Sequence, residues 1–315
     1  MTRRKECLFP RALLEAIRHF SDADTCLEFV GALRWPGGEP VCPHCESEGA
    51  YFLDTRRIWK CKACKKQFSV RVGTIFQDSP IKLDKWLSAI WLVANAKNGM
   101  TSHELARSIG VTQKTGWFML HRIRLAMQGE SFEKLEGEVE VDETFIGGQA
   151  RYMHKDRREK RIKGRGPAGK AVVIGLLQRR GEVRIKVVPG AKKKTVQTEV
   201  RDNVEPGSDV FTDALPSYEG LDPEYVHQVI NDAERCAKSN VDTDCVESFW
   251  SLLKRVIKGT YVSVGPFHLF RYLDGRAFRF NSGKGNGAGR FLAVGASVAG
   301  RRLTYADAIG DTATE

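Results

Sequence analysis

The stretch VEVDETFIGG, residues 139–148, decides the fold of the larger part of this chain. Apolar Val139, Val141 and Phe145 alternate with polar residues, which is the period of a β-strand with one buried face. Two glycines then end the pattern. Asp142 lies within the strand, where a carboxylate is costly unless it is solvated, paired or bound to a metal. The stretch therefore predicts an α/β domain whose first strand carries a functional acid.

The segments that follow predict the remaining elements of this domain. An apolar strand and an alternating strand are joined by a turn at Gly181, and a helix, two short strands and a long amphipathic helix come after them. Their expected bounds are 171–177, 183–188, 195–203, 209–212, 225–230 and 244–257. This order of strands and helices is that of a ribonuclease H-like domain. We therefore expect such a domain over residues 137–282.

Further acids fall near the ends of these elements. Asp213 follows the short strand 209–212, and Glu247 lies on the last helix. Clustered carboxylates hold two Mg²⁺ ions roughly 3.5 to 4 Å apart in many enzymes of phosphoryl transfer. Glu247 and Lys254 share one helix face with Asp244 one turn earlier, so Lys254 could hold a phosphate beside the ions. An ordinary ladder of surface ion pairs would give the same spacing.

Two cysteine pairs lie upstream of this domain. Cys42-x2-Cys45 and Cys61-x2-Cys64 are separated by fifteen residues. Such pairs can close a tetrahedron around one Zn²⁺ with Zn–S bonds of about 2.3 Å, or they can form two disulfides. No apolar leader directs the chain to an oxidising compartment, which favours zinc and a cytoplasmic protein. We expect a structural zinc ribbon over residues 39–75.

Residues 80–130 have the pattern of a helical DNA-binding domain. Thr101 begins a short helix as a capping residue, a turn follows at Gly110, and Thr112 can cap the next helix. A short helix, a glycine turn and a second helix predict a helix-turn-helix, although a plain helical bundle fits the pattern too. The expected contacts to DNA on the last helix are Gln113, Lys114, Thr115 and Arg122.

Charge supports a polyanionic partner. Lys and Arg number 50 against 39 Asp and Glu, a net charge of +11, which favours binding to phosphates. Segment 151–166 contains eight Lys or Arg and two acids. It is either an arm that orders on DNA, through Arg157, Arg158 and Arg161, or a solvated loop. No apolar run reaches the roughly 18 residues that a membrane span needs.

The two ends of the chain are expected to differ. Residues 1–38 place Ala12, Leu13 and Ile17 at helical spacing and close with a Pro-Gly-Gly turn, which predicts a helical lead-in. Residues 283–315 are rich in glycine and then mixed and polar. This composition predicts a flexible tail.

Several of these motifs resemble those of one known family. CPHC, CKAC, VEVDETFIGG, VFTDALPSY and the string over 246–281 are similar to motifs of zinc-ribbon DDE transposases of bacterial insertion sequences, the ISXO2-like transposases. The resemblance spans about residues 40–281. It implies a ribbon, a helix-turn-helix and a ribonuclease H-like catalytic domain in that order. It further implies a structural Zn²⁺, two catalytic Mg²⁺, double-stranded DNA with terminal inverted repeats and target DNA as partners, and a homo-oligomer on DNA.

The same resemblance assigns roles to the acids. It implies that Asp142 and Asp213 bind metal, that Glu247 is the candidate third ligand, and that Lys254 contacts phosphate. Similar proteins often carry His-Thr-Asn where this chain has Asp-Thr-Asp over 242–244, so Asp244 competes for the third place. The expected function is DNA transposition. A DNA-binding regulator with an inert catalytic domain, and a nuclease that cuts without joining, are the alternatives.

Overall fold

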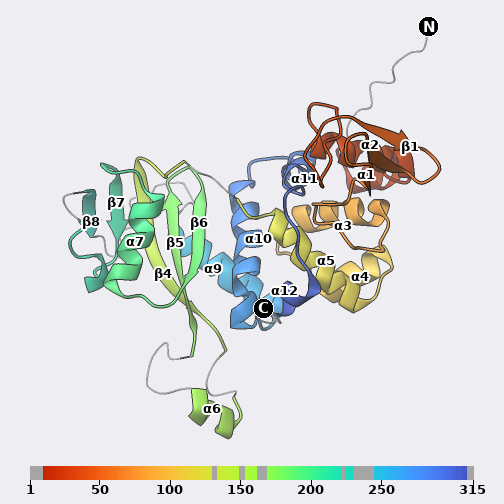
Figure 1. Ribbon diagram of the computed structural model, residues 1–315. Coiled ribbons are helices and arrows are strands. Elements are labelled where there is room, and N and C mark those ends of the chain that lie inside the picture. The colour runs from red at the N-terminus through yellow and green to blue at the C-terminus, as the bar shows by residue number, and fades with distance from the viewer. Residues whose placement is uncertain are drawn as a thin grey trace. The chain divides into compact units, whose positions relative to one another are not determined.

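The computed structural model describes residues 10–129, 133–148, 153–161, 169–221, 224–229 and 245–310, without the side chains of 157, 160 and 161. These residues form two compact units, and each is described by itself. The first unit comprises Met1–Gln128 with Ser282–Glu315, and the second comprises Gly129–Asn281 (Figure 1). Among the residues that are described, no helix has both the length and the apolar character that crossing a bilayer requires.

The first unit joins a small sheet to helices from both ends of the chain. The sheet has the order β1-β2-β3, and neighbouring strands are antiparallel. The bounds are α1 Leu13–His19, α2 Ala23–Arg34, β1 Ala50–Leu53, β2 Ile58–Cys61, β3 Gln67–Phe68, α3 Leu83–Asn95, α4 Ser102–Ile109, α5 Gln113–Ala126, α11 Gly287–Ala296 and α12 Tyr305–Ile309.

Side-chain caps fix where the helices of the middle segment begin. Thr101 Oγ1 accepts the backbone N–H of Glu104 at 3.1 Å at the start of α4. Gly110 then ends this helix with a left-handed φ of 64°, a conformation that suits glycine. Thr112 Oγ1 accepts the backbone N–H of Thr115 at 3.2 Å and begins α5. These caps confirm the helix starts that the sequence predicts at Thr101 and Thr112.

The last part of the chain belongs to the core of the first unit. Helix α11 buries Phe291 completely, with its ring 5.6 Å from that of Phe20 and 5.2 Å from that of Trp91. Two backbone hydrogen bonds also pair residues 298–300 with 73–75. The prediction of a flexible tail over 283–315 is therefore wrong for residues 287–309. Glycine lowers helix propensity, but burial of an apolar face outweighs this effect.

The second unit is built on a mixed five-stranded sheet of order β6-β5-β4-β7-β8. Strands β6, β5 and β4 are antiparallel neighbours, whereas β4, β7 and β8 run parallel to one another. The bounds are β4 Glu138–Ile146, α6 Lys155–Arg161, β5 Ala171–Gln178, β6 Val183–Val188, α7 Lys193–Asn203, β7 Asp209–Thr212, β8 Val226–Val229, α9 Val246–Val256 and α10 Leu269–Asn281. Each strand and helix predicted for this domain is present, with small differences at its ends.

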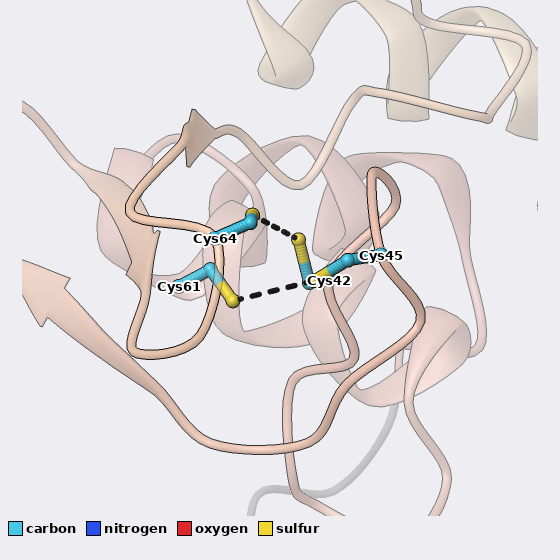
Figure 2. A group of neighbouring side chains, drawn as sticks. All are labelled: Cys42, Cys45, Cys61 and Cys64. Carbon is cyan, nitrogen blue, oxygen red and sulfur yellow. Dashed lines mark hydrogen bonds between the residues drawn. The ribbon is translucent and has the colours of Figure 1, made fainter.

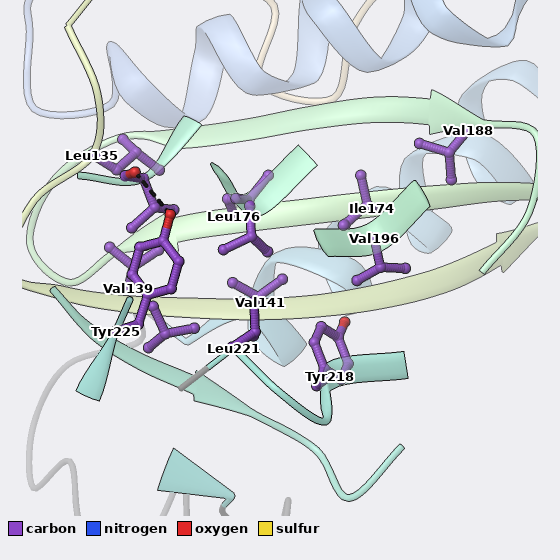
Figure 3. Packing of buried hydrophobic residues seen from close by; sticks show 13 residues of the cluster. Leu135, Val139, Val141, Ile174, Leu176, Val188, Val196, Tyr218, Leu221 and Tyr225 are labelled. Atoms are coloured by element: carbon purple, nitrogen blue, oxygen red, sulfur yellow. Dashed lines mark hydrogen bonds between the residues drawn. The ribbon is translucent and has the colours of Figure 1, made fainter. Parts of the chain in front are cut away.

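The alternating pattern of β4 places its two faces in different surroundings. Val139 and Val141 point into an apolar cluster that includes Val196 and Val200 of α7 (Figure 3). The opposite face, which carries Asp142, packs against a second apolar cluster formed largely by residues of α9 and α10. The acid therefore lies on the helix-covered face on which α9 packs.

Candidate functional site

The four cysteines of the ribbon converge on one point. Cys42 and Cys45 precede β1, and Cys61 and Cys64 lie where β2 ends. Figure 2 shows their sulfurs facing one another across the site. Cys42 Sγ is 3.6 Å from Cys64 Sγ, and the Sγ atoms of the other two are 3.7 Å apart. A tetrahedral Zn²⁺ with bonds of about 2.3 Å holds its sulfurs about 3.8 Å apart, so the spacing fits a structural zinc ion.

Hydrogen bonds from Ser47 favour the thiolate form, which binds metal, at Cys45 and Cys61. The pKa of Cys64 is raised to about 11, because burial and the other cysteines outweigh a hydrogen bond from the backbone of Lys66. Ser47 Oγ lies 3.0 Å from Cys45 Sγ and 3.3 Å from Cys61 Sγ. The Ser47 hydroxyl, followed by the backbone N–H of Cys64, lowers the pKa of Cys61 to about 6. None of the six cysteines in the described ranges is part of a disulfide, and sulfur separations of 3.6 and 3.7 Å far exceed the roughly 2.05 Å of an S–S bond. The alternative of two disulfides is not what this structure contains.

Two of the predicted acids belong to neighbouring parallel strands of the second unit. Asp142 lies inside β4, and Asp213 directly follows the last residue of β7. The pairing of β4 with β7 ends with Glu140 opposite Phe211, and two residues further the strands reach Asp142 and Asp213. Both carboxylates are partly buried. Asp213 Oδ1 accepts the backbone N–H of Leu215 at 3.2 Å. In open α/β sheets, ligands bind outside the carboxyl ends of the strands, so the topology favours a site at this edge.

Glu143, which has no sequence-based prediction, adds a further carboxyl group near these two acids. Its Oε2 accepts the hydroxyl hydrogen of Tyr218 at 2.5 Å, and its Oε1 is buried without a hydrogen-bond partner among the described residues. Burial raises the pKa of Glu143, the Tyr218 hydrogen bond opposes this, and the charges of Asp213 and Asp142 raise the pKa further. These charge effects indicate that the three carboxyl groups share one electrostatic environment.

A buried carboxylate fixes the start of α9 to β4. Glu140 is 1% exposed, and its Oε2 accepts the backbone N–H of Val246, the first residue of α9, at 3.1 Å. Its Oε1 accepts the Nε–H of Arg179 at 3.1 Å, so the buried charge is compensated. Negative charge at a helix N-terminus is also stabilised by the helix dipole. Glu247 therefore stands in the first turn of a helix that is tied to the strand of Asp142.

The three predicted catalytic acids do not form a closed ligand set in the described part of the chain. There, the four cysteines form the one group of three or more His, Cys, Asp or Glu residues with donor atoms all within 4.8 Å. Glu247 is exposed on α9, and Lys254 is exposed about two turns further along it. Asp244 lies outside the described residues. The identity of the third ligand therefore stays a prediction.

The start of α5 keeps its expected polar residues on the surface. Gln113 is exposed and its Nε2 donates to Ser102 Oγ at 2.8 Å. Lys114 is exposed, with its Nζ 5.2 Å from the ring centroid of Tyr305. Thr115 is partly buried. Contact with DNA stays a prediction for these three side chains.

Arg122, predicted as a fourth DNA contact on α5, is buried instead. It is 3% exposed. Its guanidinium donates to backbone oxygens at 2.6 to 3.1 Å, those of Gln77, Ile75 and Leu303. Arg122 is buried because the chain near Leu303 covers one face of α5. The sequence pattern of α5 does not predict that this face is covered. Arg122 stabilises the first unit and does not face a ligand.

The basic segment 151–166 contains a short helix. Residues Lys155–Arg161 form α6, and Arg158 is exposed on it. Arg157 and Arg161 lie on the same helix, and their side chains are outside the described set. Contact with DNA stays a prediction for all three arginines.

The chain thus combines a cysteine cluster whose geometry fits Zn²⁺ with an α/β domain that carries acids on its sheet. Comparison with known proteins identifies the class of protein. Residues 134–281 match the model of the ISXO2-like transposase domain, and residues 21–67 match that of the transposase zinc-ribbon domain. The chain therefore belongs to the ISXO2-like transposase family.

Two relatives are similar to this chain, one over most of its length and one over a shorter stretch. An uncharacterized protein in the transposable element ISH50 of Halobacterium salinarum is 25% identical over 252 residues, covering 76% of this chain and 84% of the relative. An uncharacterized transposase-like protein of Haemophilus influenzae is 31% identical over 97 residues, covering 30% of this chain and 78% of the relative.

Proposed function

We propose that this protein is a transposase that binds the terminal inverted repeats of an insertion sequence and catalyses metal-dependent strand cleavage and strand transfer. The observation that carries the proposal is the position of Asp142 and Asp213 just beyond the paired ends of β4 and β7. The match of residues 134–281 to the ISXO2-like transposase domain supports it. The strand order β6-β5-β4-β7-β8 supports a ribonuclease H-like fold for this domain.

The donor set of the sheet edge fits a hard divalent cation. Carboxylate oxygens are the side-chain ligands that Mg²⁺ prefers, and Asp142 and Asp213 would hold it together with either Glu247 or Asp244. Two bound ions would activate the attacking oxygen and stabilise the leaving one. Lys254 would contact a DNA phosphate as a point charge.

Two displacements at phosphorus describe the reaction. In the first, the oxygen of a water molecule bonds to the scissile phosphorus while the bond to the 3′-oxygen breaks, which leaves a 3′-hydroxyl and a 5′-phosphate. In the second, this 3′-hydroxyl attacks a phosphorus of the target DNA and displaces another 3′-oxygen. No covalent bond to the protein is required in either step.

The first unit would hold the DNA. Helices α4 and α5 cross closely at Gly116, where a Cβ would lie 2.9 Å from the backbone oxygen of Ser102. This tight crossing after the Gly110 turn supports a helix-turn-helix with α5 as the recognition helix. Gln113, Lys114 and Thr115 at its start would then reach base edges or phosphates.

Other basic elements would add contacts to the DNA backbone. The arginines of α6, Arg157, Arg158 and Arg161, are expected to neutralise phosphates near Asp142. A zinc ion in the ribbon would stabilise the fold of that module. Two element ends must be processed together, so a dimer or a larger assembly on DNA is expected.

The test separates binding from chemistry. Full-length protein carrying Asp142→Asn or Asp213→Asn is compared with wild type on duplexes that contain an element end, with Mg²⁺ or Mn²⁺ present. Binding should be unchanged. Cleavage should fall about 1000-fold or more, because the ions contribute several kcal/mol to transition-state stabilisation. Asp202→Asn, an exposed acid on α7, is the matched control and should cut normally.

Other outcomes point to other functions. Variants at position 142 or 213 that still cut would remove the proposed mechanism. Wild-type protein that binds element ends and never nicks them would favour a regulator. Protein that cuts but does not join pre-cut ends to target DNA would favour a nuclease. Comparison of Glu247→Gln with Asp244→Asn in the same assay identifies the third acid.

A further inference from the structure

Trp250 joins the helix α9 to the carboxylate of Asp142. Its indole Nε1–H donates to Asp142 Oδ2 at 2.9 Å, and the side chain is 3% exposed. The other carboxylate oxygen, Oδ1, accepts the backbone N–H of Glu143 at 2.8 Å. A carboxylate turns easily about its last torsion. Two donors from different elements, one on each oxygen, therefore fix the plane of this carboxylate.

The strand next to Asp142 provides the space that this contact needs. Gly175 of β5 pairs directly with Asp142 of β4, and residues opposite one another in an antiparallel pair share a face. A Cβ at Gly175 would lie 2.5 Å from Cζ2 and 2.7 Å from Cη2 of Trp250. Non-bonded carbon atoms do not approach one another this closely. Because glycine has no side chain, Gly175 leaves a slot that the edge of the Trp250 indole occupies.

Packing alone does not account for this arrangement. Phe249, the neighbouring residue on α9, is also completely buried in the same apolar cluster and has no polar atom. Trp250 adds an N–H group, which requires an acceptor when it is buried. Its acceptor is Asp142 in the middle of the central strand β4, 108 positions away in the sequence.

We propose that Trp250, seated in the slot at Gly175, is a positioning residue that orients the Asp142 carboxylate to bind a divalent cation. This rests on the proposed function in one respect, that Asp142 is a metal ligand. Each carboxylate oxygen has two acceptor directions, so both hydrogen bonds can persist while a cation is held. Partners of this kind typically change metal affinity about 10- to 100-fold when they are removed.

The test measures cation binding without DNA and without turnover. Zinc-loaded full-length protein is titrated with Mn²⁺, and the free ion is counted by electron paramagnetic resonance. Trp250→Phe keeps an aromatic ring and removes the donor, and it should weaken Mn²⁺ binding about 10- to 100-fold. Gly175→Ala should weaken it in the same direction, because the added methyl displaces the indole.

Matched controls separate orientation from stability. Phe249→Leu removes buried volume from the same helix without touching a hydrogen bond, and Gly190→Ala adds a methyl where no atom lies within 4 Å. Both should bind Mn²⁺ as wild type does. Thermal unfolding of each variant shows whether a loss of affinity merely follows a loss of stability.

The outcomes distinguish this inference from the function on which it rests. If Asp142→Asn loses Mn²⁺ and Trp250→Phe binds within about twofold of wild type, the positioning role is overturned and the metal site stands. If wild type binds no Mn²⁺, or Asp142→Asn binds equally well, the metal site itself fails.

A second measurement tests the proposal without the Trp250→Phe variant, in case that variant does not fold. The chain has six tryptophans, and their ¹⁵N-labelled indole groups each give one resonance. Mn²⁺ should broaden one of them selectively in wild type and none in Asp142→Asn. Uniform broadening would overturn the role of Trp250, whereas no broadening in wild type would show that the metal site itself fails.

Discussion

The cysteine site and the carboxylate site differ in how far along the chain their members lie. Cys42 and Cys64 are separated by 22 positions and lie in the turns around one small sheet. Asp142 and Trp250 are separated by 108 positions and meet only because a central strand and a helix pack together. A metal site can thus be encoded locally by spacing, or assembled from distant segments by a sheet. The first kind can be recognised in a sequence, whereas the second needs the fold.

The electrostatics of the two sites follow the same division. A nearby hydroxyl, that of Ser47, and a backbone N–H lower the pKa of Cys61 to about 6. At the sheet edge, burial raises the pKa of Glu143, and the charges of Asp213 and Asp142 add to the rise. In the ribbon, the groups that lower the pKa of Cys61 come from the same short segment of the chain. The sheet edge gathers negative charge from separate strands, which a cation would relieve.

Loss of zinc should have the largest effect and should stay local. Cys45→Ser removes one of four ligands, and metal binding is worth about 10 to 16 kcal/mol in isolated zinc-finger peptides. We expect β1, β2 and β3 to lose protection in amide hydrogen exchange while the second unit keeps it. Cys245→Ser, whose hydroxyl can replace the thiol as the cap of α9, should keep its zinc. Loss of protection in both units would contradict the local character of the ribbon.

Phe291→Ala tests whether the first unit also depends on distant residues. The ring is completely buried, and its removal should lower the free energy of unfolding by about 3 to 5 kcal/mol in chemical denaturation. Leu292→Ala, on the same helix but 38% exposed, should change it by less than about 1 kcal/mol. Equally small changes in the free energy of unfolding for both variants would support the flexible tail that the composition predicts.

Glu140→Gln probes the anchor between β4 and α9. The charge is buried and bonded to Arg179 and to the start of α9, so its loss should cost about 2 kcal/mol. Glu138→Gln is the control, because Glu138 contacts the same arginine at 2.6 Å but its side chain is 51% exposed. That exposed pair should contribute less than about 1 kcal/mol. Equal losses in urea titrations would show that burial does not distinguish the two acids.

Thr112→Ala should have the smallest effect of this series. It removes the side-chain cap of α5, which is worth about 1 kcal/mol. Thr198→Ala is the control, since Thr198 lies inside α7 and bonds only to the preceding turn. Alanine is a better helix former there, so stability should not fall. A larger loss at position 198 than at 112 would contradict the assignment of the cap.

Much of the second unit could be predicted because its signals are short-ranged. The alternation in 139–145 fixes which residues of β4 face the α7 side, and Gly181 marks the turn between β5 and β6. Asp142 and Asp213 can be singled out in the sequence because a carboxylate in or directly after a strand needs solvent, a partner or a metal. Glu143 and Trp250 did not stand out, since their roles depend on Tyr218 and Gly175 in other elements.

The errors in the first unit have the same origin. Arg122 was predicted as a DNA contact because it lies on a helix with a polar beginning, and the structure buries it under a segment about 180 residues later in the chain. Residues 287–296 were predicted to be flexible because they are rich in glycine. These residues form the helix α11, whose apolar face packs into the first unit, where Phe291 contacts Trp91.

The sequence by itself determined the order of elements from β4 to α9 apart from α6, the caps at Thr101 and Thr112, and the spacing of the zinc ligands. Each of these depends on hydrogen bonds or periodicities that span fewer than about eight residues, or on paired cysteines in a short segment. Only the tertiary structure decided that Arg122 is buried, that α11 completes the first unit, and that Trp250 reaches Asp142 through the slot at Gly175. These contacts depend on which faces of distant elements meet, and burial of apolar surface selects those faces without leaving a local pattern.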